Sequence, residues 1–150
     1  MYYCIQACHP HLQKDIDVEK VQRRATKLIN ECKGLEYEQR LKVTKLTTLE
    51  TRRRRADLSE VFKIIKGMEG LNEEIFFTRV QAQSNNTSTT RGHMFKLYKK
   101  RFRLDIAKYS FGNRIVSDWN ALPDRVIEAE DLGAFKGRFD HYLNHTRGLV

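Results

Sequence analysis

The fold is decided by residues 47–68, which read TTLETRRRRADLSEVFKIIKGM. Thr47 to Glu50 has the Ser/Thr-x-x-Glu form of a capping box, so a helix is predicted to begin here and to run to about Gly67 or Gly70. One arc of this helix is apolar and is expected to face the core. That arc consists of Leu58, Val61, Phe62, Ile64, Ile65 and Met68.

Four consecutive arginines, Arg52 to Arg55, occupy the first turns of the same helix. They sweep through about 300°, so they cannot all share the solvent face. Arg54 points in the direction of Val61 and Ile65. Because an unpaired buried arginine is costly, either its guanidinium reaches a carboxylate or phosphate, or the first turn stands clear of the core.

Two further helices are predicted before this one. Residues 15–32 have a helical pattern with Asp15 or Asp17 as the cap, and Gly34 ends it. A shorter helix covers residues 36–43 and carries Tyr37 and Leu41. In the first helix a basic arc of Lys20, Arg23, Arg24 and Lys27 adjoins a predicted buried arc of Val18, Val21, Ala25, Leu28, Ile29 and Cys32.

The second half of the chain has a different pattern. Residues 73–77 predict one helical turn, and residues 81–90 read as a flexible polar linker. Residues 94–106 loosely alternate apolar and basic side chains, which predicts a short β-hairpin with Lys99 and Lys100 near its turn. A helix should stop before Pro123, and a last one should follow Asp131. Their buried faces are Phe111, Ile115, Trp119 and Leu122, and then Leu132, Phe135, Phe139, Tyr142 and Leu143.

These patterns predict a mainly α protein: a small bundle of three helices, a short β-hairpin and two further helices. The expected organisation is a truncated leader at 1–18, a helical bundle at 19–70, a linker at 71–92 and a hairpin-helix-helix subdomain at 93–146. With 150 residues, 40% of them apolar, the chain can bury only a modest core.

The charge of the chain predicts a polyanionic partner. The formal net charge is +9, and the excess is concentrated in residues 19–55, with 12 Lys and Arg against 5 acids, and in residues 91–114, with 8 against 1. Nucleic acid is the favoured partner, and an acidic protein, an anionic membrane surface or a merely solvated basic surface are the alternatives. The predicted contacts are Lys20, Arg23, Arg24, Lys27, Arg52, Arg53 and Arg55, with Lys99, Lys100, Arg101 and Arg103 as a second region.

Catalytic and metal-binding patterns are weak. No nucleophile elbow, Walker loop or dinucleotide-binding glycine pattern is present, so neither an enzyme nor a cofactor is expected. The group of Cys4, Cys8, His9 and His11 has no standard zinc spacing, and the pair His141 and His145 lacks a third ligand. Three cysteines make a disulfide framework improbable, and no apolar run is long enough for a membrane span. A nuclear or cytoplasmic location is expected, with Cys32 in a core position.

Several strings resemble the C-terminal part of the reverse transcriptases of non-LTR retrotransposons, the LINE-type elements of the CR1/jockey group. They extend in order over nearly the whole chain. The strings are EKVQRRATK at 19–27, LTTLE at 46–50, DL at 57–58 with VFKI at 61–64, TRGH at 90–93, WNALP at 119–123 and AFK at 134–136.

The resemblance implies the thumb of the polymerase and the segment that follows it. A thumb grips the template–primer duplex through its backbone, so RNA, DNA or an RNA–DNA hybrid is the implied partner. The Tyr/Phe-x-Asp-Asp signature of the catalytic palm is absent, which implies a truncated copy without polymerase activity. Two alternatives are a helical protein-interaction module, with self-association through an apolar edge at Tyr2, Tyr3 and Ile5, and an inert reading frame derived from a retroelement.

Overall fold

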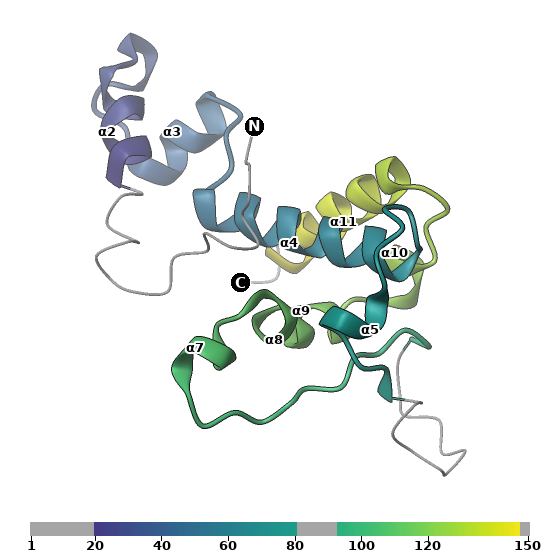
Figure 1. Ribbon diagram of the computed structural model, residues 1–150. Coiled ribbons are helices and arrows are strands. Elements are labelled where there is room, and N and C mark those ends of the chain that lie inside the picture. The colour runs from purple at the N-terminus through teal and green to yellow at the C-terminus, as the bar shows by residue number, and fades with distance from the viewer. Residues whose placement is uncertain (1–19, 81–92, 148–150) are drawn as a thin grey trace. The chain divides into compact units, whose positions relative to one another are not determined.

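The computed structural model describes residues 20–80 and 93–147 (Figure 1). These residues are mainly helical, as predicted, and none of them belongs to a β-strand. The chain divides into two compact units, Met1–Arg54 and Arg55–Val150. The boundary falls within helix α4 (Leu49–Ile65), whereas the sequence predicted one bundle over residues 19–70. The predicted leader at 1–18 lies outside the described residues.

The first unit contains α2 (Lys20–Leu28), a single 3₁₀ turn η2 (Asn30–Cys32) and α3 (Tyr37–Val43), and these elements contact one another (Figure 1). The chain reverses between η2 and α3 at Gly34, whose φ of +78° is a conformation that suits glycine. The N–H of Leu35 donates to the carbonyl of Cys32 at 3.3 Å and closes this turn.

The side of α2 that packs inward differs from the predicted side. Cys32 is buried as predicted, but Val21 and Leu28 are 62% and 83% exposed, so their predicted burial is wrong. The buried residue of α2 is Thr26, whose hydroxyl donates to the carbonyl of Arg23. A helical period tells which residues share a side, but the position of the neighbouring elements decides which side is covered.

The cap of helix α4 lies one residue later than predicted. The hydroxyl of Thr48, rather than that of Thr47, accepts a hydrogen bond from the backbone N–H of Thr51 at 3.1 Å. Thr47 instead accepts a hydrogen bond from Nε of Arg52 at 3.3 Å. The predicted helix is therefore correct, and its predicted capping pair is wrong.

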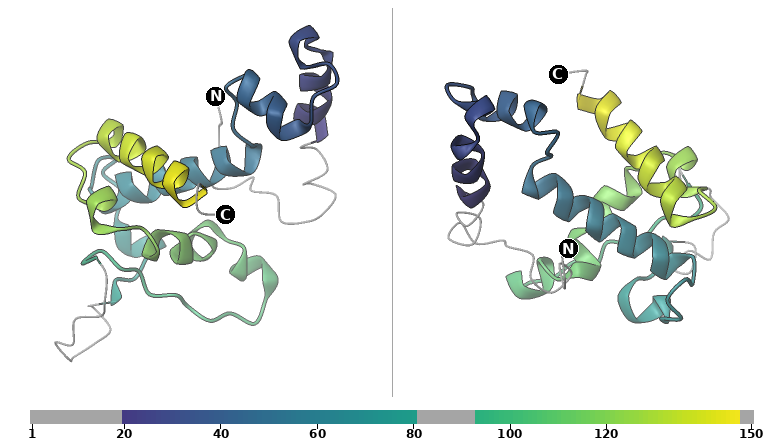
Figure 2. Two further views of the ribbon diagram at one scale, coloured as in Figure 1. Left: turned by 180° about the vertical axis from the view of Figure 1, so that it is seen from behind. Right: turned by 90° about the horizontal axis from the view of Figure 1, so that it is seen from above.

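The core of the second unit lies between the latter part of α4 and α11 (Leu132–Arg147), which run beside each other in Figures 1 and 2. The rings of Phe62 and Phe135 stack with centroids 4.5 Å apart. The predicted apolar arc of α4 is buried from Leu58 to Ile65, but Met68 is 45% exposed because the helix ends at Ile65.

Short helices complete the second unit. They are α5 (Glu73–Phe76), α7 (Asp105–Lys108), α8 (Phe111–Arg114), α9 (Val116–Asn120) and α10 (Asp124–Ile127). The single helix predicted before Pro123 is thus divided into α8 and α9, and α10 was not predicted. The predicted apolar side is correct, since Ile115, Trp119 and Leu122 are buried. Gly112 allows close packing, because a Cβ there would lie 2.7 Å from the carbonyl oxygen of Phe76.

The predicted β-hairpin within residues 94–106 is wrong. The N–H of Tyr98 donates to the carbonyl of Thr78 at 2.7 Å, and the N–H of Val80 donates to the carbonyl of Lys96 at 3.0 Å. These bonds form an isolated antiparallel bridge between Arg79 and Leu97. Alternation specifies extended backbone but not its partner, and here the partner is the segment after α5.

This pairing also affects the predicted linker at 71–92. Phe77 is 3% exposed and belongs to the core of the second unit, so residues 73–80 are folded structure. The polar run at 81–90 lies outside the described residues.

Candidate nucleic-acid interface

Four cationic side chains from three segments of the first unit line one pocket. Arg23 and Lys27 come from α2, Lys33 follows η2, and Arg40 comes from α3. The pocket has a volume of about 570 Å³. Among the described residues that line it, Glu36 is the one acidic residue. Four cations against one carboxylate make the pocket attractive to anions.

The ring of Tyr37 is shared by two of these cations. The guanidinium carbon of Arg23 lies 4.6 Å from the ring centroid, and that of Arg40 lies 5.6 Å from it. An aromatic face attracts a cation by about 0.5–1 kcal/mol at an exposed site. Tyr37 therefore helps to keep two like charges at the same pocket.

Arg40 is the most deeply placed of the four cations. It is only 5% exposed, and its Nε has no hydrogen-bond partner in the structure. Buried arginine is normally paired with a carboxylate or with several acceptors, because an unpaired buried charge is costly. Arg40 thus presents hydrogen-bonding capacity that the described part of the chain leaves unused.

The remaining lining residues explain how the chain forms the pocket. Cys32, Gly34 and Leu35 lie at the turn between η2 and α3. Lys33 and Cys32 also line the pocket, and Cys32 is 1% exposed. The spacing of Tyr37 and Arg40 puts them on one face of α3.

Sequence reasoning predicted only part of this pocket. Of the predicted α2 contacts, Lys20, Arg23, Arg24 and Lys27 are all exposed, but only Arg23 and Lys27 line the pocket. Lys33, Tyr37 and Arg40 were not predicted as contacts. A Tyr-x-x-Arg pair directly after a glycine turn was the available signal, but it is common in helices that bind nothing.

The arginines of α4 differ in burial. Arg52 and Arg53 are half-buried and Arg54 is exposed, while Thr51 beside them is 8% exposed. Arg55 forms an ion pair of 2.6 Å with Asp140 of α11. This pair leaves Arg55 less available for a phosphate than predicted.

The second predicted contact region is exposed. Lys99, Lys100, Arg101 and Arg103 all have exposed side chains. Nζ of Lys99 donates to the hydroxyl of Ser117 at 2.6 Å. Arg114, which belongs to the same basic stretch, is instead turned inward.

Arg114 forms a buried ion pair with Asp57. Its Nε and Nη2 donate to the two carboxylate oxygens at 3.1 Å and 3.0 Å, and the side chains are 12% and 2% exposed. Nη1 also donates to the carbonyl of Tyr109 at 3.2 Å. This contact joins α4 to α8 within the second unit, so its role is structural.

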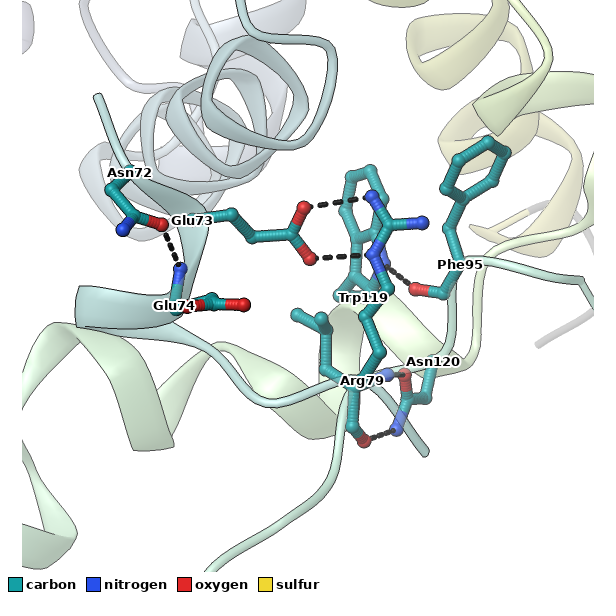
Figure 3. A network of polar contacts seen from close by, with 8 residues as sticks. Asn72, Glu73, Glu74, Arg79, Phe95, Trp119 and Asn120 are labelled. Atoms are coloured by element: carbon teal, nitrogen blue, oxygen red, sulfur yellow. Dashed lines mark hydrogen bonds and ion pairs between the residues drawn. The ribbon is translucent and has the colours of Figure 1, made fainter. Parts of the chain in front are cut away.

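A second polar network in the same unit surrounds Trp119 (Figure 3). Its Nε1 donates to the carbonyl of Phe95 at 2.8 Å, while the side-chain amide of Asn120 bonds to both backbone polar atoms of Leu97. Arg79 holds Glu73 through two bonds of 2.7 Å. All of these partners lie within the protein, so this network binds segments of the chain to one another.

His93 also belongs to this network. Its Nε2 lies 3.2 Å from the carbonyl oxygen of Trp119 and must be the donor, since a carbonyl only accepts. Nδ1 is buried without a partner. Burial lowers the pKa of His93, because it disfavours the imidazolium form.

No metal centre is formed by the described residues. His141 and His145 stack on α11 with centroids 4.4 Å apart, but no group of three His, Cys, Asp or Glu side chains within residues 20–80 and 93–147 could hold a metal ion. The other predicted candidate, Cys4, Cys8, His9 and His11, lies outside these residues. Cys32 has a free, buried thiol, in agreement with its predicted core position.

None of the helices in the described residues has the length and apolar character of a membrane span. The chain matches no protein-family model, no curated protein and no solved structure. Its candidate function therefore depends on the arrangement of its own side chains.

Proposed function

We propose that this chain binds the phosphate backbone of nucleic acids without sequence specificity and has no catalytic activity of its own. The observation that carries the proposal is the pocket formed by Arg23, Lys27, Lys33 and Arg40. Cations gathered from separate segments bind phosphates by charge and hydrogen bonding without reading the bases. RNA, DNA and an RNA–DNA hybrid all present this backbone.

The proposal includes the resemblance to the thumb and post-thumb part of LINE-type reverse transcriptases. Two of the strings that carry the resemblance meet in the second unit, where His93 of TRGH bonds to Trp119 of WNALP. Asp57, from a third string, holds Arg114. These contacts support the proposal because residues from three of the strings take part in the packing of one unit.

The experiment is a salt titration of binding to an RNA–DNA hybrid and to duplex DNA. The triple variant R23Q/R24Q/K27Q should lower the affinity for both and flatten the plot of log affinity against log salt. Each lost phosphate contact reduces the slope for a duplex by about 0.9. We therefore expect a reduction of about 2–3.

A matched control is the triple variant K42Q/K45Q/R125Q, which removes the same charge from exposed side chains that do not line the pocket. Its slope should stay within about 1 of that of the unmodified protein, because only directly neutralised phosphates release counterions. Equal slopes for the unmodified protein and R23Q/R24Q/K27Q would reject α2 as the contact.

A second candidate function is favoured by the exposed apolar side chains of α2. Val21 and Leu28 are seven residues apart, so they share a face of the helix, and both are more than half exposed. This face fits a protein-interaction module, with a second copy of the chain as one partner. Sedimentation at moderate salt tests it: self-association that V21Q/L28Q abolishes would support this function, and a monomer at all concentrations would reject it.

A further inference from the structure

One cation of the pocket in the first unit is less accessible than a surface contact with a duplex requires. Arg40 lines the pocket with only 5% of its surface exposed, whereas Arg24 on the neighbouring helix is exposed and does not line it. From the burial of Arg40 among exposed cations we infer that the pocket binds the phosphate at the end of a nucleic-acid strand, with Arg40 as its least exposed ligand. The inference rests on the proposed nucleic-acid function and specifies the chemical group that enters this site.

The guanidinium of Arg40 calls for an anionic partner. Its Nε has no hydrogen-bond partner, and the contact of its charged group that the structure shows is with the ring of Tyr37. An aromatic ring attracts a cation but accepts none of its in-plane N–H bonds. An anion in the pocket supplies the opposite charge for this guanidinium, whose Nε is itself buried.

The charge of the pocket fits a phosphomonoester. A terminal phosphate carries between one and two negative charges at neutral pH and offers three acceptor oxygens, whereas an internal phosphodiester carries one charge and two free oxygens. Among the described residues, four cations line this pocket together with one carboxylate, that of Glu36. The more highly charged group therefore gains more from this site.

The size of the pocket also favours a terminal phosphate over an internal one. An internal phosphate of a stiff duplex is attached to the chain on both sides and stays at the surface, while a strand end can enter a recess. The volume of about 570 Å³ is larger than a phosphate needs and falls within the range of pockets that hold small ligands. The pocket thus has room for the terminal nucleotide together with its phosphate.

Lys33 and Lys27 give the site its selectivity for charge, since both line the pocket with exposed side chains. Arg23 is held over Tyr37 at 4.6 Å, so it is positioned before a ligand arrives. A ligand therefore meets cations whose positions the helices and the turn at Gly34 already determine.

The experiment compares two single-stranded oligonucleotides of identical sequence, one with a 5′-phosphate and one with a 5′-hydroxyl group. Both carry a fluorescent label at the 3′ end, and binding to the full chain is measured by anisotropy at fixed salt. The unmodified protein should bind the 5′-phosphorylated strand at least fivefold more tightly. R40Q and K33Q should each reduce this ratio toward one.

The control is R24Q, which removes a cation of α2 that does not line the pocket. It should lower the affinity for both strands by the same factor and leave their ratio unchanged. Because R40Q changes a buried residue, its circular dichroism spectrum is compared with that of the unmodified protein. K33Q changes an exposed side chain and tests the inference even if R40Q does not fold.

Three outcomes overturn the inference. One is equal binding of the two strands by the unmodified protein, and another is a preference that survives in both R40Q and K33Q. The third is competition by inorganic phosphate or a nucleoside monophosphate at the same concentration as the strand, which would assign the pocket to a free phosphate compound. Equal binding that remains salt-dependent leaves the proposed function standing, whereas no binding of either strand rejects both.

Discussion

The side-chain amide of Asn120 bonds to both polar backbone atoms of Leu97. Its Oδ1 accepts from the N–H of Leu97 at 2.9 Å, and its Nδ2 donates to the carbonyl of Leu97 at 2.8 Å. Leu97 is 1% exposed, so water cannot replace these bonds. A single side chain thus provides the hydrogen bonds that a neighbouring strand would give in a hairpin.

Replacing Asn120 by alanine should lower the free energy of unfolding of the second unit by about 1–3 kcal/mol, because two buried backbone groups lose their partners. N120D should also be destabilising, since a carboxylate accepts from the N–H but repels the carbonyl of Leu97. The fluorescence of the one tryptophan, Trp119, during urea denaturation reports on this unit.

Asn144 provides the control for this measurement. It lies exposed on α11, and N144A should change the free energy of unfolding by less than about 0.5 kcal/mol. If N120A were as mild as N144A, the bonds to Leu97 would not stabilise the unit.

The contact of Asn120 also shows why the predicted hairpin is wrong. The alternation in residues 94–106 gave the correct local tendency, since Leu97 is buried and its neighbours Lys96 and Tyr98 bond to an adjacent segment. The identity of that segment depends on the packing of α5 and α9, which are distant in sequence. Periodicity carries no information on such pairings.

Long helices with a strong apolar stripe were predicted best. The stripes of α4 and α11 agree with the structure at Phe62, Phe135 and Phe139, because each helix crosses a large core. Helix α2 has only nine residues, and Val21 and Leu28 are exposed despite their period. A short helix in a small unit is positioned mainly by its connections.

The candidate site was predicted less completely than the fold. The density of positive charge in the sequence indicated α2 as a contact element. Two of its cations, Arg23 and Lys27, line the pocket. Arg40 could not be found in this way, because its role depends on burial and on a missing partner. Conversely, Arg114 belongs to a basic stretch, but Asp57 engages it in the interior.

Removing Asp57 should be among the most destabilising single changes in the second unit. D57A leaves the guanidinium of Arg114 with little exposure and without its carboxylate, which costs about 3–5 kcal/mol. Urea denaturation followed by Trp119 fluorescence measures this loss.

The ion pair of Arg55 with Asp140 offers a matched comparison. Its side chains are 40% and 46% exposed, so D140A should cost no more than about 1 kcal/mol. Equal effects of D57A and D140A would contradict the importance of burial for these pairs.

The stability of the second unit should fall as the pH falls below about 6.5, because of His93. Burial lowers the pKa of folded His93 below its ordinary value of 6.5, while nearby Asp124 raises it and Lys96 lowers it further. The unfolded chain then binds the proton more readily, so this stabilisation is complete above pH 6.5 and is lost as the pH falls through the folded pKa. Protonation would also place an N–H on the unpartnered Nδ1.

Urea denaturation at a series of pH values between about 7.5 and 5.5, one unit on either side of the ordinary histidine pKa, tests this prediction. H93Q can still donate to the carbonyl of Trp119 but does not titrate, so its stability should depend less on pH. H141Q alters an exposed histidine of α11 and should keep the pH dependence of the unmodified protein. The same slope in H93Q and the unmodified protein would exclude His93 as the cause.

Gly34 should be required for the shape of the pocket, and alanine there should destabilise the first unit by about 1–2 kcal/mol. Its φ is +78°, and a Cβ at this position would meet no atom within 4 Å, so the cost comes from the backbone alone. The strain should loosen the turn that places Lys33, and the affinity for a 5′-phosphorylated strand should fall with it. Hydrogen exchange of the α2 and α3 amides measures the stability of this unit directly.

Gly137 provides a comparison, because alanine at this position is expected to change the stability in the opposite direction to alanine at Gly34. It lies exposed within α11, and a Cβ there would also meet nothing within 4 Å. Alanine favours the helix over glycine by about 0.5–1 kcal/mol, so G137A should stabilise the second unit and leave binding unchanged. Stabilisation by G34A as well would mean that the turn does not hold the positive φ on which the pocket depends.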